Sequence, residues 1–195
     1  MRRRKQIRLE GYDYSLPGAY FVTICTKDRI EIFGHILDGE MIRNDCGNIV
    51  QSCWEELPLH YPHIQLDEFV VMPNHIHGII IIHDNTVNTV GSRHASTLPS
   101  GQSNVLGNIV GSFKSAATKR INEMRKTPGS SVWQSRFYDH IIRNEKSLNR
   151  IREYMRTNPQ QWEWDKENVK CIGMDEFDRW LDEEGRHKIP KGRDS

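Results

Sequence analysis

The chain has few cysteines and no long apolar run, and each shortage excludes a class of protein. Its four cysteines lack the paired spacing of a zinc site, so we expect free thiols in a reducing compartment. The apolar runs are too short to cross a bilayer, and the basic residues 1–5 are not followed by the apolar stretch of a secretory signal. We therefore expect a cytoplasmic protein without a membrane partner, built as one domain with appendages.

Net charge is also scarce, at +1, but this balance hides a segregation of charge along the chain. Residues 108–152 carry ten Lys or Arg against three Asp or Glu, whereas residues 153–185 carry ten acidic residues against four basic ones. A basic middle beside an acidic tail predicts an anionic ligand for the middle. Solvated helix faces would explain part of this excess, so charge alone indicates nucleic acid only weakly.

Residues 70–82 form the most informative stretch, a run of β-branched residues interrupted by His75 and His77. Such a run predicts a buried strand. Successive side chains of a strand point to opposite faces, so both histidines share one face. Two imidazoles on one rigid face can bind a metal ion between them. One core histidine beside one surface histidine is the alternative.

The remaining pattern predicts alternating strands and helices. A Pro-Asn turn at 73–74 joins the histidine strand to a preceding strand. Residues 84–104 are rich in Asn, Ser, Thr and Gly, which predicts a long loop. The other predicted elements are strands at 20–26, 69–72 and 132–143, and helices at 45–59, 106–126, 144–158 and 175–184.

Tyr154 and Asn158 are four residues apart on a predicted helix, so they lie on the same helical face. Beside a neighbouring strand, a phenol and a carboxamide could serve as a nucleophile and a metal ligand. The commoner reading of such a pair is structural, because an Asn before Pro159 is also a good helix end.

Three motifs, in this order and spacing, resemble a known family. They are Met-Pro-Asn-His-Ile-His at 72–77, Trp-Gln-x-Arg-Phe-Tyr-Asp-His at 133–140, and Tyr-Met-x-x-Asn-Pro at 154–159. Together they resemble the single-tyrosine HUH transposases, in particular the REP-associated tyrosine transposases, from about residue 18 to residue 159. The resemblance implies an α+β fold, with helices packed on a ferredoxin-like antiparallel sheet. It also implies cleavage of single-stranded DNA near hairpin repeats through a covalent 5′-phosphotyrosine.

By the same resemblance, His75, His77 and Asn158 would bind a divalent metal ion, and Tyr154 would be the nucleophile. Mg²⁺ or Mn²⁺ suits such ligands. We expect a catalytic domain over 18–160, with a loop insertion at 84–104, between a basic arm at 1–17 and an acidic extension at 161–195; the loop and the acidic extension lie outside the part that resembles the family. We expect a monomer or homodimer at the nucleoid. The basic side chains that we expect to contact DNA are Arg2, Arg3, Arg4, Lys114, Lys119, Arg120, Arg136 and Arg143.

Other functions remain open at this level. A non-catalytic hairpin-binding protein or repressor, with structural histidines, would bind DNA without forming an adduct. A metallohydrolase that uses water, with Tyr154 in the core, would release a free 5′-phosphate. Tyr138 is a rival nucleophile, but no metal-ligand amide lies one helical turn from it.

Overall fold

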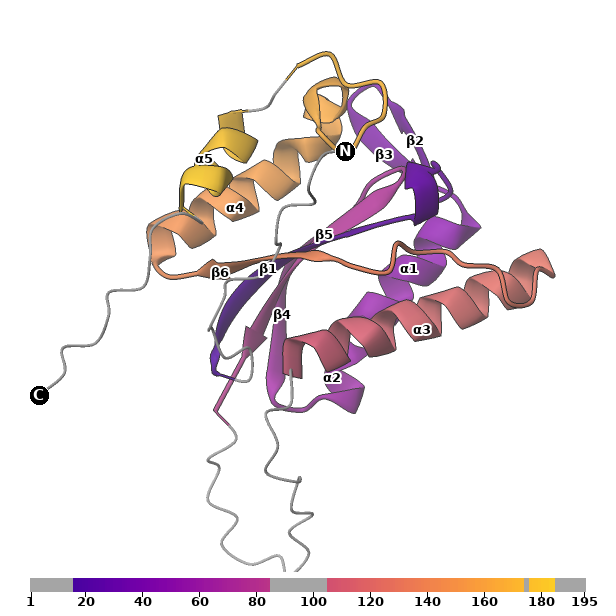
Figure 1. Ribbon diagram of the computed structural model, residues 1–195, viewed down its shortest axis with the longest axis horizontal. Helices are drawn as coiled ribbons and strands as arrows, with labels where there is room; N and C mark the ends of the chain where they lie inside the picture. The colour runs from indigo at the N-terminus through magenta and orange to yellow at the C-terminus, as the bar shows by residue number, and fades with distance from the viewer. Residues whose placement is uncertain (1–15, 85–104, 174–175, 185–195) are drawn as a thin grey trace, which may run out of the picture.

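The structure is a computed structural model that describes residues 16–84, 105–173 and 176–184 (Figure 1). Arg2, Arg3, Arg4 and nearly all of the predicted loop at 84–104 lie outside the described residues. No helix within the described ranges is long and apolar enough to cross a membrane.

A four-stranded antiparallel sheet forms the centre of the molecule. Its strands are β1 (Gly18–Cys25), β4 (Ile64–Val71), β5 (His75–Ile82) and β6 (Tyr138–Ile142). They lie in the order β4-β5-β1-β6, so β5 and β1 are the central neighbours. Helices lie in the chain between β1 and β4 and between β5 and β6, whereas a turn joins β4 to β5. This is the ferredoxin-like α+β arrangement predicted from the sequence.

Helices cover both faces of the sheet (Figure 1). One face carries α1 (Asp45–Glu55) and α3 (Val105–Arg125), and the other carries α4 (Glu145–Thr157) and α5 (Glu176–Glu184). Strand β1 serves both layers, because Val22 packs with α1 and α3 while its neighbour Phe21 packs with α4 and α5. The shorter elements are η1 (Lys27–Arg29), β2 (Gly34–Leu37), β3 (Glu40–Arg43), α2 (Leu57–His60) and η2 (Asn158–Trp164).

Local signals in the sequence place several boundaries correctly. The side chain of Asn44 accepts a hydrogen bond from the Gly47 amide, and that of Asn144 accepts one from the Ser147 amide. Both asparagines therefore cap the helices that follow them. The turn at 73–74 joins β4 to β5 as predicted.

Three predicted elements are wrong in their extent. The strand expected at 69–72 begins five residues earlier, since β4 covers Ile64–Val71. The helix expected at 45–59 breaks after residue 55, and Pro58 lies in the first turn of the separate helix α2, where its missing amide proton costs no hydrogen bond. The strand expected at 132–143 contains only β6. The preceding residues instead run alongside the end of β1. There Trp133 forms a β-bridge with Thr26, and the backbone N–H of Gln134 donates to the backbone carbonyl of Cys25 at 3.0 Å.

Candidate metal centre and nucleophile

The two histidines of β5 are held by strands on both sides. His75 lies opposite Cys25 and His77 lies opposite Thr23 on β1, and β4 pairs with the other edge of β5. Both imidazoles are buried on the same face, as the strand alternation predicts, and their Nε2 atoms are 3.0 Å apart. The sheet therefore fixes two nitrogen donors at one point.

Hydrogen bonds on the far side of each ring set the position of its proton. The side-chain Nδ2 of Asn74 donates to the backbone carbonyls of Glu167 (2.8 Å) and Arg29 (3.2 Å). Its side-chain Oδ1 is therefore free to accept a hydrogen bond. His75 Nδ1 lies 2.9 Å from that oxygen and must donate to it, which leaves the lone pair of neutral His75 on Nε2. His77 Nδ1 lies 2.8 Å from Thr23 Oγ1. Such partners orient metal-binding histidines in proteins.

Burial keeps both imidazoles neutral. It lowers the pKa of His75, although the negative charges of Asp165 and Glu167 oppose this effect. Burial lowers the pKa of His77 well below its usual value, and His75 lowers it further. Neutral imidazoles keep a lone pair for a cation near pH 7.

A carboxylate from a distant part of the chain completes this group. Asp165 follows η2, and its buried Oδ2 atom lies 3.6 Å from His75 Nε2. One ligand atom from each of His75, His77 and Asp165 falls within 4.8 Å of the others. Two imidazoles and a carboxylate are a donor set that fits a divalent ion. Sequence reasoning did not select Asp165, because it is one of ten acidic residues between 153 and 185 and no motif marks it.

Tyr154 on α4, and Asn158 at the end of that helix, lie against the group formed by His75, His77 and Asp165. The buried Asn158 side chain donates from Nδ2 to Asp165 Oδ2 at 2.7 Å, while its Oδ1 has no hydrogen-bond donor among the described residues. The Tyr154 hydroxyl lies 3.4 Å from His77 Nε2. The structure thus brings together all four side chains predicted for metal binding and attack on DNA.

Aromatic rings enclose the group. Phe21 stacks on His77 with ring centroids 5.2 Å apart, and Trp162 stacks on His75 at 5.9 Å. The ring of Phe177 on α5 lies face to face with Tyr154, with centroids 3.7 Å apart. The rival tyrosine, Tyr138, lies on β6 with Lys166 Nζ 5.5 Å from its ring centre. The group is therefore buried against aromatic side chains.

The basic side chains predicted to contact DNA are not gathered at this group. Arg120 donates to both carboxylate oxygens of Glu56, at 2.8 and 2.5 Å. Arg143 donates to the Glu184 carbonyl at 3.3 Å. The side chains of Lys119 and Arg136 are exposed, and Lys114, Lys119 and Arg120 all belong to α3, on the opposite face of the sheet.

The chain is similar in sequence to two proteins of Haemophilus influenzae and in fold to a solved transposase structure. No protein-family model matches the chain. It is 43% identical over 167 residues to an uncharacterized protein of Haemophilus influenzae, across 84% of this chain and 92% of that protein. It is 25% identical over 154 residues to a second Haemophilus influenzae protein, assigned as a REP-associated tyrosine transposase, across 75% of this chain and 73% of that protein. The solved structure of a REP-associated tyrosine transposase bound to a REP hairpin superposes with a TM-score of 0.53 at 19% identity, across 82% of this chain and 76% of that one, and has the same fold.

Proposed function

We propose that the chain, which is similar to REP-associated tyrosine transposases in sequence and in fold, cleaves and rejoins single-stranded DNA beside hairpin repeats, with Tyr154 as the nucleophile. One observation carries this proposal. The Tyr154 hydroxyl lies 3.4 Å from His77 Nε2, beside the buried group of His75, His77 and Asp165. A phenol held against two neutral imidazoles and a carboxylate suits attack on a phosphodiester better than simple core packing does.

The donor set supports a bound Mg²⁺ or Mn²⁺ ion. His75, His77 and Asp165 would hold it, and Asn158 would add its amide oxygen, which has no donor among the described residues. Mn²⁺ accepts nitrogen ligands more readily than Mg²⁺ does. When bound, such an ion polarises the phosphate and orients it for in-line displacement.

The residues of the chain supply the covalent step. The Tyr154 oxygen forms a bond to phosphorus and loses its proton, while the bond to the 3′-oxygen breaks and that oxygen gains a proton. One phosphodiester replaces another, so rejoining the strand to a new 3′-hydroxyl needs no ATP. The stacked ring of Phe177 orients the phenol and helps to exclude water, which favours strand transfer over hydrolysis.

A single chain contributes every member of this group. His75 and His77 come from β5, Tyr154 from α4, and Asp165 from the segment after η2. The proposed chemistry therefore needs no side chain from a second copy, and a monomer suffices for cleavage. We propose that the chain acts at the nucleoid, where chromosomal hairpin repeats are found.

The substitution Tyr154→Phe tests the proposal. It removes one oxygen and keeps the ring that packs on Phe177, so the fold and DNA binding should persist. With labelled hairpin DNA and Mn²⁺, the wild-type protein should form a covalent adduct on a denaturing gel, and the variant should form none. Mass spectrometry of the trapped nucleotide-peptide should map the adduct to Tyr154.

The matched control is Tyr138→Phe, which should retain the adduct. An adduct on Tyr138, or on any residue outside α4, would refute the assignment. Cleavage that leaves only a free 5′-phosphate would identify a metallohydrolase that uses water. Hairpin binding without cleavage would identify a DNA-binding protein or repressor.

A further inference from the structure

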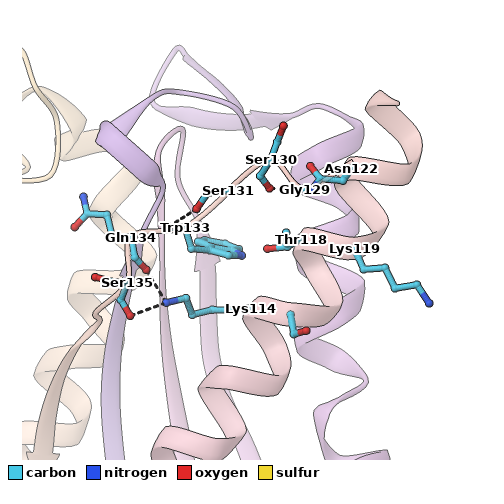
Figure 2. A pocket seen from close by; sticks show the side chains of 11 residues that line it. Lys114, Thr118, Lys119, Asn122, Gly129, Ser130, Ser131, Trp133, Gln134 and Ser135 are labelled. Carbon is cyan, nitrogen blue, oxygen red and sulfur yellow. Dashed lines mark hydrogen bonds between the residues drawn. The ribbon is translucent and has the colours of Figure 1, made fainter. Parts of the chain in front are cut away.

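A polar pocket lies on the opposite face of the sheet from Tyr154, between α3 and the loop that precedes β6 (Figure 2). Its cavity volume is about 470 Å³, which is in the range of ligand-binding pockets. The lining contains two lysines, five hydroxyl side chains and two side-chain amides, and none of the lining residues is acidic. Such a lining offers donors to an anion and no carboxylate to repel it.

Trp133 provides a buried donor inside this pocket. Phe33 and Phe113 pack against its ring, with centroids 5.2 and 5.5 Å away, and only 5% of the residue is exposed. Its indole nitrogen has no acceptor among the described residues. Figure 2 shows the ring extending from the loop toward Thr118 on α3. A buried N–H group without an acceptor is unfavourable, so this position favours a ligand that supplies an acceptor oxygen.

Lys114 fixes the loop to α3 and adds positive charge to the same pocket. Its ammonium donates to the carbonyls of Gln134 (2.6 Å) and Ser135 (3.2 Å), as Figure 2 shows. An ammonium has three N–H donors, so one remains for a ligand. Lys119 also borders the pocket, but it is exposed and Figure 2 shows its side chain extending away from the loop.

The pocket is connected to the candidate metal centre through β1. The backbone N–H of Gln134 donates to the backbone carbonyl of Cys25, and Cys25 lies directly opposite His75 in the sheet. The exposed Arg136 lies in the sequence between the pocket residue Ser135 and β6. A single strand that leaves the pocket could therefore pass Arg136 at the β6 edge before it reaches the face of Tyr154.

We propose that this pocket binds a phosphate of the single-stranded DNA outside the scissile bond, with the Trp133 indole N–H and the remaining Lys114 N–H as donors. The inference rests on the proposed function for the identity of the strand. The pocket holds the strand on one face of the sheet while the chemistry takes place on the other.

Two substitutions test this pocket in the full chain. Thr118→Glu places a carboxylate against the phosphate and should weaken binding of a single-stranded oligonucleotide about tenfold or more. The dependence of log K on log salt should become shallower by about 0.7 for each phosphate that the protein no longer neutralises. The control Ala116→Glu makes a similar charge change at an exposed position of α3 outside the pocket, and it should have a smaller effect.

Trp133→Phe removes the indole N–H and keeps an aromatic ring in the core. We expect binding to weaken about two- to tenfold, because the variant lacks a donor that has no acceptor among the described residues of the free protein. The smaller ring also packs less well against Phe33 and Phe113, so some loss of thermal stability accompanies the substitution whether or not the indole contacts DNA. Unchanged binding would instead identify a purely structural tryptophan.

The indole resonance of Trp133 in a ¹H–¹⁵N spectrum, identified by its loss in Trp133→Phe, gives a readout independent of cleavage. It should shift on titration with the oligonucleotide, and only weakly with inorganic phosphate or a mononucleotide. An equal response to inorganic phosphate would identify a small-anion site instead. An unmoved indole resonance, or equal binding by Thr118→Glu and Ala116→Glu, would refute the pocket. A Tyr154 adduct formed in the same preparation would show that the proposed function survives that result.

Discussion

At the scale of single residues, the candidate metal centre depends on a carboxylate that no motif marks. Asp165 Oδ2 is buried 3.6 Å from His75 Nε2 and also accepts a hydrogen bond from Asn158. Asp165→Asn keeps the shape and removes the charge, so the affinity for Mn²⁺ should fall about tenfold or more in the absence of DNA. Titration calorimetry would measure this change.

Glu167→Gln is the matched control, because Glu167 is a neighbouring acid that pairs with Arg29 at 2.7 Å and does not belong to the donor group. It should bind Mn²⁺ with nearly wild-type affinity. If Asp165→Asn also bound Mn²⁺ as tightly as the wild type, the ion would not use this carboxylate.

Residues that depend on a short-range pattern could be predicted from the sequence. The shared face of His75 and His77 follows from the alternation of one strand, and that of Tyr154 and Asn158 follows from one helical turn. Asp165 could not be predicted in this way. Its position depends on η2, which turns the chain back toward β5 after Pro159, and on packing that no local pattern encodes.

At the scale of elements, helix α1 packs so closely on the sheet that position 78 of β5 has room only for glycine. A Cβ atom on Gly78 of β5 would lie 2.3 Å from Cζ2 of Trp54, whose ring stacks on Phe69. Gly78→Ala should therefore lower the free energy of unfolding by about 1–3 kcal/mol, because this core has no room for the methyl group. Urea denaturation would measure the loss.

The same substitution at Gly111 provides a control of opposite sign. Gly111 lies on α3, and a Cβ atom there would meet nothing within 4 Å. Gly111→Ala should raise the stability by about 0.5–1 kcal/mol through helix propensity. Equal effects at both positions would show that contact with Trp54 does not determine whether β5 accepts a methyl group at position 78.

Elements with a clear period were predicted, and those defined by tertiary packing were not. The aromatic pattern at 132–137 is typical of a strand, yet Trp133 turns into the core against Phe33 and Phe113, and β6 begins only at Tyr138. The short hairpin of β2 and β3 was missed, because its residues are mostly exposed or half-buried and show no strong alternation of apolar side chains.

At the scale of the whole molecule, buried histidines make stability depend on pH. Burial, assisted by the charge of Arg143, lowers the pKa of His140 to about 4, whereas the unfolded chain binds this proton below about 6.5. The unfolded state therefore holds more protons between these values, so stability falls as the pH falls. Between pH 7.5 and 5, His140 should account for a loss of about 2 kcal/mol.

His140→Leu should make the unfolding free energy less steep over this pH range, as measured by urea denaturation at several pH values. The comparison is His83→Leu, which removes an exposed histidine in place of a buried one. Equal slopes for the wild type and His140→Leu would show that other groups govern the acid sensitivity.

The buried donor group also has a consequence for cooperativity. It combines one carboxylate, Asp165, with two neutral imidazoles, so a divalent cation held there leaves an excess of positive charge in a site that burial shields from water. In the proposed reaction, a backbone phosphate of the DNA would bring the opposite charge to the same place. Ion and strand should then act as mutual effectors, each raising the affinity of the other by the same factor, because linkage between two ligands is reciprocal.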